Sequence, residues 1–172
     1  MKSGYYKGVK PLRLLLLATL AATLAGCTQQ PSVRMVGSKA PDFTVTDSDH
    51  TVSLHDYRGK GKIVILNFWS AHCAPCIAEM PSLVRLQKRM ADKIVVVGVA
   101  VDTENDEYHA FLRKYGIDFV TVLDSAKKSY DLYGATGYPE TTIIDPNGMA
   151  RRKFVIAVDW GRPDIVEYLQ KL

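Results

Sequence analysis

The sequence predicts an α/β domain in which helices cover both faces of a largely parallel sheet. Two runs, 63–69 and 94–101, are almost entirely apolar and rich in β-branched residues, which is typical of strands buried on both faces. Helical stretches lie between and after them, and strands that alternate with helices favour parallel pairing through crossovers. With 172 residues, 47% of them hydrophobic and 23% charged, the chain is long enough to bury such a core.

The other predicted elements continue this alternation along the chain. Short strands at 43–46 and 51–54 flank a polar turn at 47–50. The last two strands are joined by a turn at 145–148 and lie close enough in sequence to form a hairpin. The remaining predictions are helices at 75–90, 105–115, 126–133 and 163–172, and strands at 119–123, 141–144 and 154–158.

Residues 37–172 are expected to form one domain, because no repeat, low-complexity tract or shift in composition interrupts them. The chain carries 22 basic and 18 acidic residues, but Lys2, Lys7, Lys10 and Arg13 fall within the first 26 residues, which contain no acid. Without that segment, basic and acidic residues are equal in number. A nucleic-acid-binding protein needs a basic surface patch, so that function is not expected.

Residues 1–26 have the pattern of a secretory signal peptide, a basic start followed by an apolar run at 14–25. The run is shorter than the roughly 20 residues that span a bilayer, which disfavours the alternative of a transmembrane anchor. The chain is therefore expected to work outside the cytoplasm, where disulfides form and persist.

The residues Leu24-Ala25-Gly26-Cys27 resemble the bacterial lipobox. The resemblance implies cleavage before Cys27, lipidation of that Cys, and a polar tether at 27–36 that anchors the domain to a membrane. An alternative is that cleavage falls nearby and Cys27 has no role. If Cys27 is lipidated, only Cys73 and Cys76 remain as thiols.

Cys73 and Cys76 form a Cys-x-x-Cys motif between a buried strand and the next helix, the context of a redox-active dithiol. A thiol at a helix N-terminus faces unpaired backbone N–H groups and the positive end of the macrodipole, which favour the thiolate. Cys73 is thus expected to be the exposed nucleophile. Cys76, one turn inside, would attack the mixed disulfide, and Pro75 fits the first turn, where its missing N–H costs nothing.

Two other interpretations of the Cys pair are less favoured. A structural zinc site needs four ligands, and the chain has no second Cys pair to supply them, so no metal is expected. An inert structural disulfide with a two-residue spacer closes too small a loop to constrain the unfolded chain much.

The segment 67–76, Asn-Phe-Trp-Ser-Ala-His-Cys-Ala-Pro-Cys, is followed by Glu79 and Pro81 and resembles the active site of the membrane-associated thioredoxin-like proteins of the bacterial envelope. That group includes the cytochrome c maturation thioredoxins. Residues 40–43 and 137–145 are similar too, and the resemblance covers about residues 37–172. It implies a thioredoxin-like fold with a central mixed sheet, helices on both faces, an N-terminal β-hairpin and an inserted βα unit, here residues 93–116.

The resemblance also implies a substrate-binding surface. Pro139 stands where the family has its cis-proline, and with Tyr138 it would offer backbone groups to an extended substrate peptide. Trp69 and His72 are expected to contribute to this surface. His72 departs from the commoner aromatic residue, and a charged imidazole there would stabilise the Cys73 thiolate; an exposed His without a role is the alternative.

Glu79 matches the family's active-site glutamate and lies three residues after Cys76, on the same helix face. Provided that its pKa is raised toward neutrality, its carboxylate could take a proton from Cys76 or relay it to solvent. The alternative is an acidic residue that the dipole favours near a helix N-terminus.

These observations predict a thiol-disulfide oxidoreductase that has no cofactor and binds no nucleic acid. It is expected to act as a reductant of disulfide-containing envelope proteins, with apocytochrome c among the candidate substrates. It is expected to be a monomer reduced by a membrane thiol electron donor. One alternative is a thiol peroxidase, but peroxiredoxins place Thr three and Pro seven residues before the reactive Cys, where this chain has Ser70 and Leu66. The other is a Cu(I) metallochaperone, since thiolates select that ion.

Overall fold

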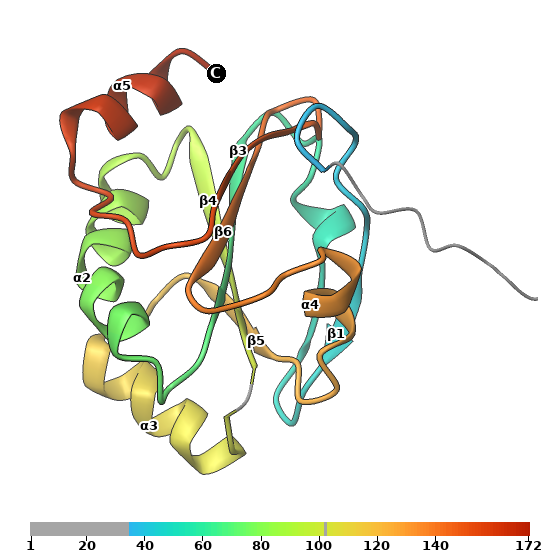
Figure 1. Ribbon diagram of the computed structural model, residues 1–172, viewed down its shortest axis with the longest axis vertical. Helices are drawn as coiled ribbons and strands as arrows, with labels where there is room; N and C mark the ends of the chain where they lie inside the picture. Colours follow the sequence, from blue (N-terminus) through green and yellow to red (C-terminus); the bar gives the residue numbers. More distant parts are fainter. Residues whose placement is uncertain (1–34, 102) are drawn as a thin grey trace, which may run out of the picture. The chain divides into compact units, whose positions relative to one another are not determined.

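The structure is a computed structural model that describes residues 35–101 and 103–172 (Figure 1). The expected signal peptide, Cys27 and most of the tether lie outside the described residues. None of the helices in the described ranges combines the length and the apolar content that a membrane span requires.

A mixed five-stranded sheet forms the centre of the domain, with its strands in the order β5-β4-β3-β6-β7. Strands β3, β4 and β5 are parallel, β6 pairs antiparallel with β3, and β7 pairs antiparallel with β6. The predicted mixed sheet and final hairpin are therefore confirmed. The strands are β3 (Ile63–Trp69), β4 (Ile94–Ala100), β5 (Val120–Leu123), β6 (Glu140–Ile144) and β7 (Ala150–Phe154).

Strand β3 contributes side chains to two hydrophobic cores, because successive side chains of a strand point to opposite faces. Ile63, Ile65 and Trp69 face a core that includes residues of three helices, α2 (Ala74–Arg89), α3 (Asn105–Tyr115) and α5 (Pro163–Gln170). Val64, Leu66 and Phe68 face the core on the other side. That side is covered by α4 (Lys128–Leu132), the short 3₁₀ helix η1 (Leu54–Asp56) and the strands β1 (Thr44–Thr46) and β2 (Thr51–Ser53) (Figure 1).

Strands β1 and β2 form the expected N-terminal hairpin, with Val45 opposite Val52. The Asp47 carboxylate accepts the backbone N–H groups of Asp49 and His50 in the turn and that of Leu123 at the end of β5. Burial acts to raise the pKa of Asp47, but these three donors outweigh it and hold the pKa below its ordinary value. The hairpin is thereby joined to β5.

The last strand begins earlier than the sequence predicts, at Ala150 rather than at residue 154. The predicted strand 154–158 is wrong, because the apolar residues Val155 and Ile156 are 63% and 68% exposed and follow β7 outside any strand. The segment 151–153 has three cations, but an edge strand tolerates them. Each has a local partner: Arg151 pairs with Asp145, Lys153 with Glu140, and Arg152 lies over the ring of Phe154.

Gly98 in β4 provides a test of how tightly the sheet packs around the end of β3. A Cβ atom at this position would lie 3.0 Å from Phe119 Cε2 and 3.2 Å from both Thr121 Oγ1 and Trp69 Nε1. We expect Gly98→Ala to lower the free energy of unfolding by about 1–3 kcal/mol, because a packed core resists an added methyl group. Urea denaturation measures this change.

Gly137→Ala is the matched control, since no atom lies within 4 Å of the position that its Cβ would occupy. Its free energy of unfolding should stay near that of the unmodified chain. Equal effects of the two substitutions would contradict tight packing at Gly98.

Candidate active site

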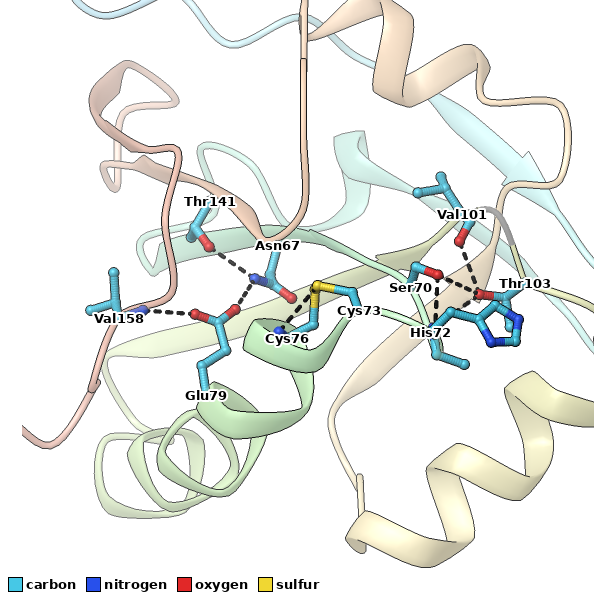
Figure 2. Close-up of a disulfide and its surroundings, with 11 residues drawn as sticks. Asn67, Ser70, His72, Cys73, Cys76, Glu79, Val101, Thr103, Thr141 and Val158 are labelled. Carbon is cyan, nitrogen blue, oxygen red and sulfur yellow. Dashed lines mark hydrogen bonds between the residues drawn. A yellow bond between two sulfur atoms is a disulfide. The ribbon is translucent and has the colours of Figure 1, made fainter.

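The two cysteines lie at the point where β3 leads into α2. Cys73 is the N-cap residue of α2, and Cys76 is fully buried in its first turn. The two form a disulfide with their Cα atoms 5.2 Å apart (Figure 2). Cys73 is only partly buried, so it is the sulfur that a partner protein can approach, and this order of exposure agrees with the predicted roles.

The start of α2 favours negative charge on Cys73. The backbone N–H of Cys76 donates to Cys73 Sγ over 3.1 Å, and the first turn contains no acidic residue. Pro75 occupies one of the first two helical positions, where its missing N–H removes no helical hydrogen bond. When the disulfide is reduced, the same N–H and the helix macrodipole stabilise a thiolate at Cys73.

Glu79 is 3% exposed and lies on the buried side of α2. Its Oε1 accepts a hydrogen bond from Asn67 Nδ2 at 2.8 Å, and its Oε2 accepts the backbone N–H of Val158 at 2.9 Å (Figure 2). Burial raises the pKa of Glu79 above its ordinary value, although the donors Val158 and Asn67 oppose the rise. This is the direction that proton exchange with a thiol requires.

A surface hollow of about 330 Å³ lies beside Glu79, between α2 and the segment that follows β7. Ser82 holds this segment in place, because its hydroxyl accepts the backbone N–H of Trp160 at 3.1 Å. The hollow connects the neighbourhood of the carboxylate with solvent. It is lined by Ala78, Glu79, Ser82, Arg85, Ala157, Val158 and Asp159.

The loop before β6 lies at the same end of the sheet as the dithiol, beside the carboxyl end of β3. Phe68 pairs with Glu140, so Pro139 is placed level with the end of β3, from which the Cys73 loop departs. The Tyr138–Pro139 peptide bond is cis, as the resemblance implies. Pro139 is buried, whereas Tyr138 is partly exposed and packs against the hydrophobic cores.

A buried ion pair, which sequence reasoning missed, fixes this loop. Glu140 is 1% exposed, and its Oε1 lies 2.7 Å from Lys153 Nζ on β7. The other carboxylate oxygen accepts the backbone N–H of Thr136 at 3.2 Å, and Lys153 also donates to the carbonyls of Tyr133 and Gly134. Glu140 stands inside the segment that carries the family resemblance, but nothing in the sequence indicates its partner.

His72 and Trp69 do not lie together on one surface. The His72 side chain is 63% exposed, and its Nε2 lies 2.9 Å from Glu107 Oε2 on α3, so the imidazole is bound to α3 rather than to a sulfur atom. Trp69 is fully buried and stacks on Phe111, with ring centroids 4.5 Å apart. The indole therefore belongs to the core, and the Trp69 carbonyl accepts the backbone N–H of Val101, so the expected contact of Trp69 with a substrate is not supported.

A second hollow, of about 270 Å³, lies between the Cys73 loop and α3. Its walls are mostly apolar, and the His72 and Glu107 pair stands at its edge. Its lining consists of Ala71, His72, Ile77, Glu107, Ala110, Phe111, Lys114 and Tyr115.

Within the described ranges, Asp47, Asp49 and His50 form a group whose ligand atoms lie within 4.8 Å of one another. Asp47 already accepts three backbone N–H groups, and His50 Nε2 lies 2.8 Å from the carbonyl of Thr121. The group is thus explained by the hairpin turn that it stabilises.

The chain is similar in sequence to known thiol-disulfide oxidoreductases and thioredoxin-like proteins. The model of the AhpC/TSA family matches residues 36–153. The thiol-disulfide oxidoreductase ResA of Geobacillus thermodenitrificans is 35% identical over 164 residues, which cover 92% of this chain and 91% of ResA. The thioredoxin-like protein YneN of Bacillus subtilis is 39% identical over 117 residues, 66% of this chain and 67% of YneN.

Solved structures agree with these relatives. The thioredoxin domain of a thiol-disulfide oxidoreductase from Bacteroides vulgatus superimposes with a TM-score of 0.67 at 28% identity, covering 79% of this chain and 96% of that domain. The exposed lipoprotein thioredoxin Etrx1 of Streptococcus pneumoniae gives a TM-score of 0.62 at 27% identity and covers 77% of this chain and all of that one. The expected thioredoxin-like fold is therefore confirmed.

Replacement of Glu79 tests its expected role in proton transfer. We expect Glu79→Gln to slow the attack of Cys76 on a mixed disulfide by roughly 10²-fold, the range typical of a lost general base. Because the pKa of Glu79 is raised above 4.5, the rate at which Cys76 resolves the mixed disulfide should rise with pH above that value in the unmodified protein, and the variant should lack the part of this rise that Glu79 contributes. Rapid mixing of the reduced protein with oxidised glutathione between pH 4 and 8 measures both effects.

Glu167→Gln is the control, since Glu167 is exposed on α5 and pairs with Lys171. Urea unfolding tests the pKa separately. A carboxyl group whose pKa is raised by folding contributes stability that is present below its unfolded pKa and is lost as pH rises through its folded pKa. The unmodified protein should therefore lose stability relative to Glu79→Gln over that interval, and parallel stability curves would contradict the raised pKa.

Proposed function

Since the chain belongs to the AhpC/TSA family and carries its dithiol in place, it is a thiol-disulfide oxidoreductase, and we propose that it reduces disulfides in proteins of the bacterial envelope. The observation that carries this proposal is the order of exposure at the start of α2, where a partly exposed Cys73 covers a fully buried Cys76. Such a pair can react with a large partner through one sulfur and release it through the other.

The proposed reaction begins with the reduced protein. The Cys73 thiolate attacks one sulfur of the substrate disulfide, a mixed disulfide forms, and the other substrate sulfur leaves as a thiolate. Cys76 then gives its proton to the Glu79 carboxylate and attacks Cys73 Sγ, which breaks the mixed disulfide and releases the second substrate thiolate. Two electrons pass to the substrate, and Cys73 and Cys76 end as the disulfide seen in the structure.

Substrate recognition is proposed to occur at the end of the sheet where the dithiol lies, beside the carboxyl end of β3. The backbone beside Pro139 would pair with an extended segment next to the substrate disulfide, with Tyr138 and His72 as flanking contacts. The resemblance to the cytochrome c maturation thioredoxins supports apocytochrome c as one such substrate.

The proposed location of the protein rests on its N-terminal sequence. Lipidation of Cys27 would hold the domain on the outer side of a membrane, and a membrane thiol donor would return electrons to the dithiol. A structurally similar protein, Etrx1, is itself described as an exposed lipoprotein, which supports this arrangement. We propose that the protein acts there as a monomer and without a cofactor.

The reduction potential of the Cys73 and Cys76 pair tests the proposed direction. A reductant should have a potential near about −270 mV, whereas a value near about −120 mV would identify an oxidant. Equilibration with glutathione mixtures of known ratio, followed by trapping of free thiols, measures the potential.

The variants Cys76→Ser and Cys73→Ser test which of the two cysteines is the nucleophile. With a disulfide-containing substrate, Cys76→Ser should accumulate the mixed disulfide through Cys73, and Cys73→Ser should form none. Accumulation with Cys73→Ser would contradict the assignment of the nucleophile.

Removal of the Cys27 thiol tests the anchor. In a bacterial host, Cys27→Ser in the full chain should move the protein from the membrane fraction to the soluble fraction, because the lipid supplies the membrane affinity. Reduction of a soluble disulfide substrate should be unchanged, since Cys73 and Cys76 are intact. A variant that stays in the membrane fraction would rule out lipidation at Cys27 as the anchor.

A further inference from the structure

The loop that joins β3 to Cys73 is held by two hydroxyl side chains. The backbone N–H of Ala71 donates to Thr103 Oγ1 at 3.1 Å, and that of His72 donates to Ser70 Oγ at 3.3 Å (Figure 2). The backbone N–H of Cys73 donates to the carbonyl of Ser70 at 3.2 Å. The backbone N–H groups of the three consecutive residues 71–73 therefore all donate hydrogen bonds.

Thr103 comes from a different part of the chain from the loop that it holds. Trp69 pairs with Ala100 in parallel strands, so the residues that follow β3 and those that follow β4 leave the sheet side by side. Thr103 is 8% exposed and donates its hydroxyl proton to the carbonyl of Val101 at 2.9 Å. This bond orients the oxygen lone pairs toward the loop, where Ala71 N–H is the donor and the Ser70 hydroxyl lies 3.5 Å away.

We propose that Thr103 is a positioning residue for Cys73, and that its hydroxyl holds the sulfur at the N-terminus of α2. The inference rests on thiol-disulfide exchange at Cys73 but not on its direction. Without the hydroxyl, the partly buried N–H of Ala71 and the carbonyl of Val101 lose this partner, which favours a shifted loop. A shifted Cys73 leaves the helix dipole and the N–H of Cys76, and its thiolate becomes less stable.

A second contact joins the same loop to α3, but it is weaker. Thr103 directly precedes Glu104, the N-cap residue of α3, and Glu107 in the first turn of that helix pairs with His72. Both members of this pair are about half exposed or more, and exposed pairs contribute little. The buried hydroxyl is therefore the stronger of the two attachments.

Charged and titratable groups of α2, α3 and the segment before β6 border the Cys73 loop. They are Glu107, Lys114 and Tyr115 on α3, Glu79 on α2 and Tyr138 before β6, and the loop itself carries His72. A substitution at Thr103 leaves all of these side chains in the protein, and only His72 moves together with the loop, so a changed pH profile in such a variant reports on the position of the Cys73 loop.

The experiment compares Thr103→Val, which removes the hydroxyl with little change of shape, with Thr103→Ser, which keeps it. Iodoacetamide alkylation of Cys73 in the reduced full chain is followed from pH 4 to 9, with mass spectrometry to locate the label. Thr103→Val should move the midpoint upward by about half a pH unit, which makes alkylation below the midpoint about threefold slower. Thr103→Ser should restore the original profile.

Thr142→Val is the matched control, because Thr142 is 1% exposed in β6 and, among residues 35–101 and 103–172, its hydroxyl makes only a long contact of 3.9 Å with Met35 Sδ. Its alkylation profile should match that of the unmodified protein. An unchanged profile in folded Thr103→Val, or equal shifts in Thr103→Val and Thr103→Ser, would overturn the proposal.

Thr103→Ala decides the question if Thr103→Val does not fold. It also removes the hydroxyl that accepts the N–H of Ala71, and it should shift the midpoint upward as well. An unchanged profile in Thr103→Ala would then overturn the proposal. Alkylation needs no protein substrate and no electron donor, so an oxidising potential of the dithiol would refute the proposed reductant without affecting this result.

Discussion

The burial of β3 on both faces and along both edges is the constraint on which the rest of the structure depends. Its seven residues are all buried, and the strand pairs with β4 on one side and β6 on the other. The chain can leave this position only at the ends of the strand. At the carboxyl end, the loop to Cys73 therefore lies between the residues that follow β4 and those that precede β6. Thr103 and Pro139 are thereby placed at the same end of the sheet as Cys73.

Asn67 is the polar exception in this strand, and it connects the core with the chemistry. Its amide donates to the Glu79 carboxylate and to the hydroxyl of Thr141, whereas its own carbonyl oxygen is buried without a hydrogen-bond partner among the described residues. An amide donor stabilises a buried carboxylate without adding a charge. The pKa of Glu79 thus reflects a balance between burial, which raises it, and neutral donors, which restrain it.

The sequence predicts those parts of the molecule that are encoded locally. The apolar runs at 63–69 and 94–101 and the Cys73 and Cys76 motif indicate their own structure, while the cis bond at Pro139 required the family resemblance. The partners of Thr103 and Glu140 are not encoded locally, because Ala71 is 32 residues from Thr103 and Lys153 lies on a neighbouring strand. The strand at 150–154 differs from the predicted 154–158 because its three cations are held by Asp145, Glu140 and Phe154, and these partners cannot be identified from the sequence of the strand itself.

The two edges of the sheet determine where another chain can pair with this one. At β5, the outward carbonyl of Thr121 is occupied by His50 and the outward N–H of Leu123 by Asp47, so the hairpin closes that edge. At β7, the cationic side chains disfavour alignment with a second copy, which would bring like charges together. Strand-to-strand association is therefore disfavoured at both edge strands, which is compatible with the proposal that the segment beside the dithiol pairs with the backbone of a substrate.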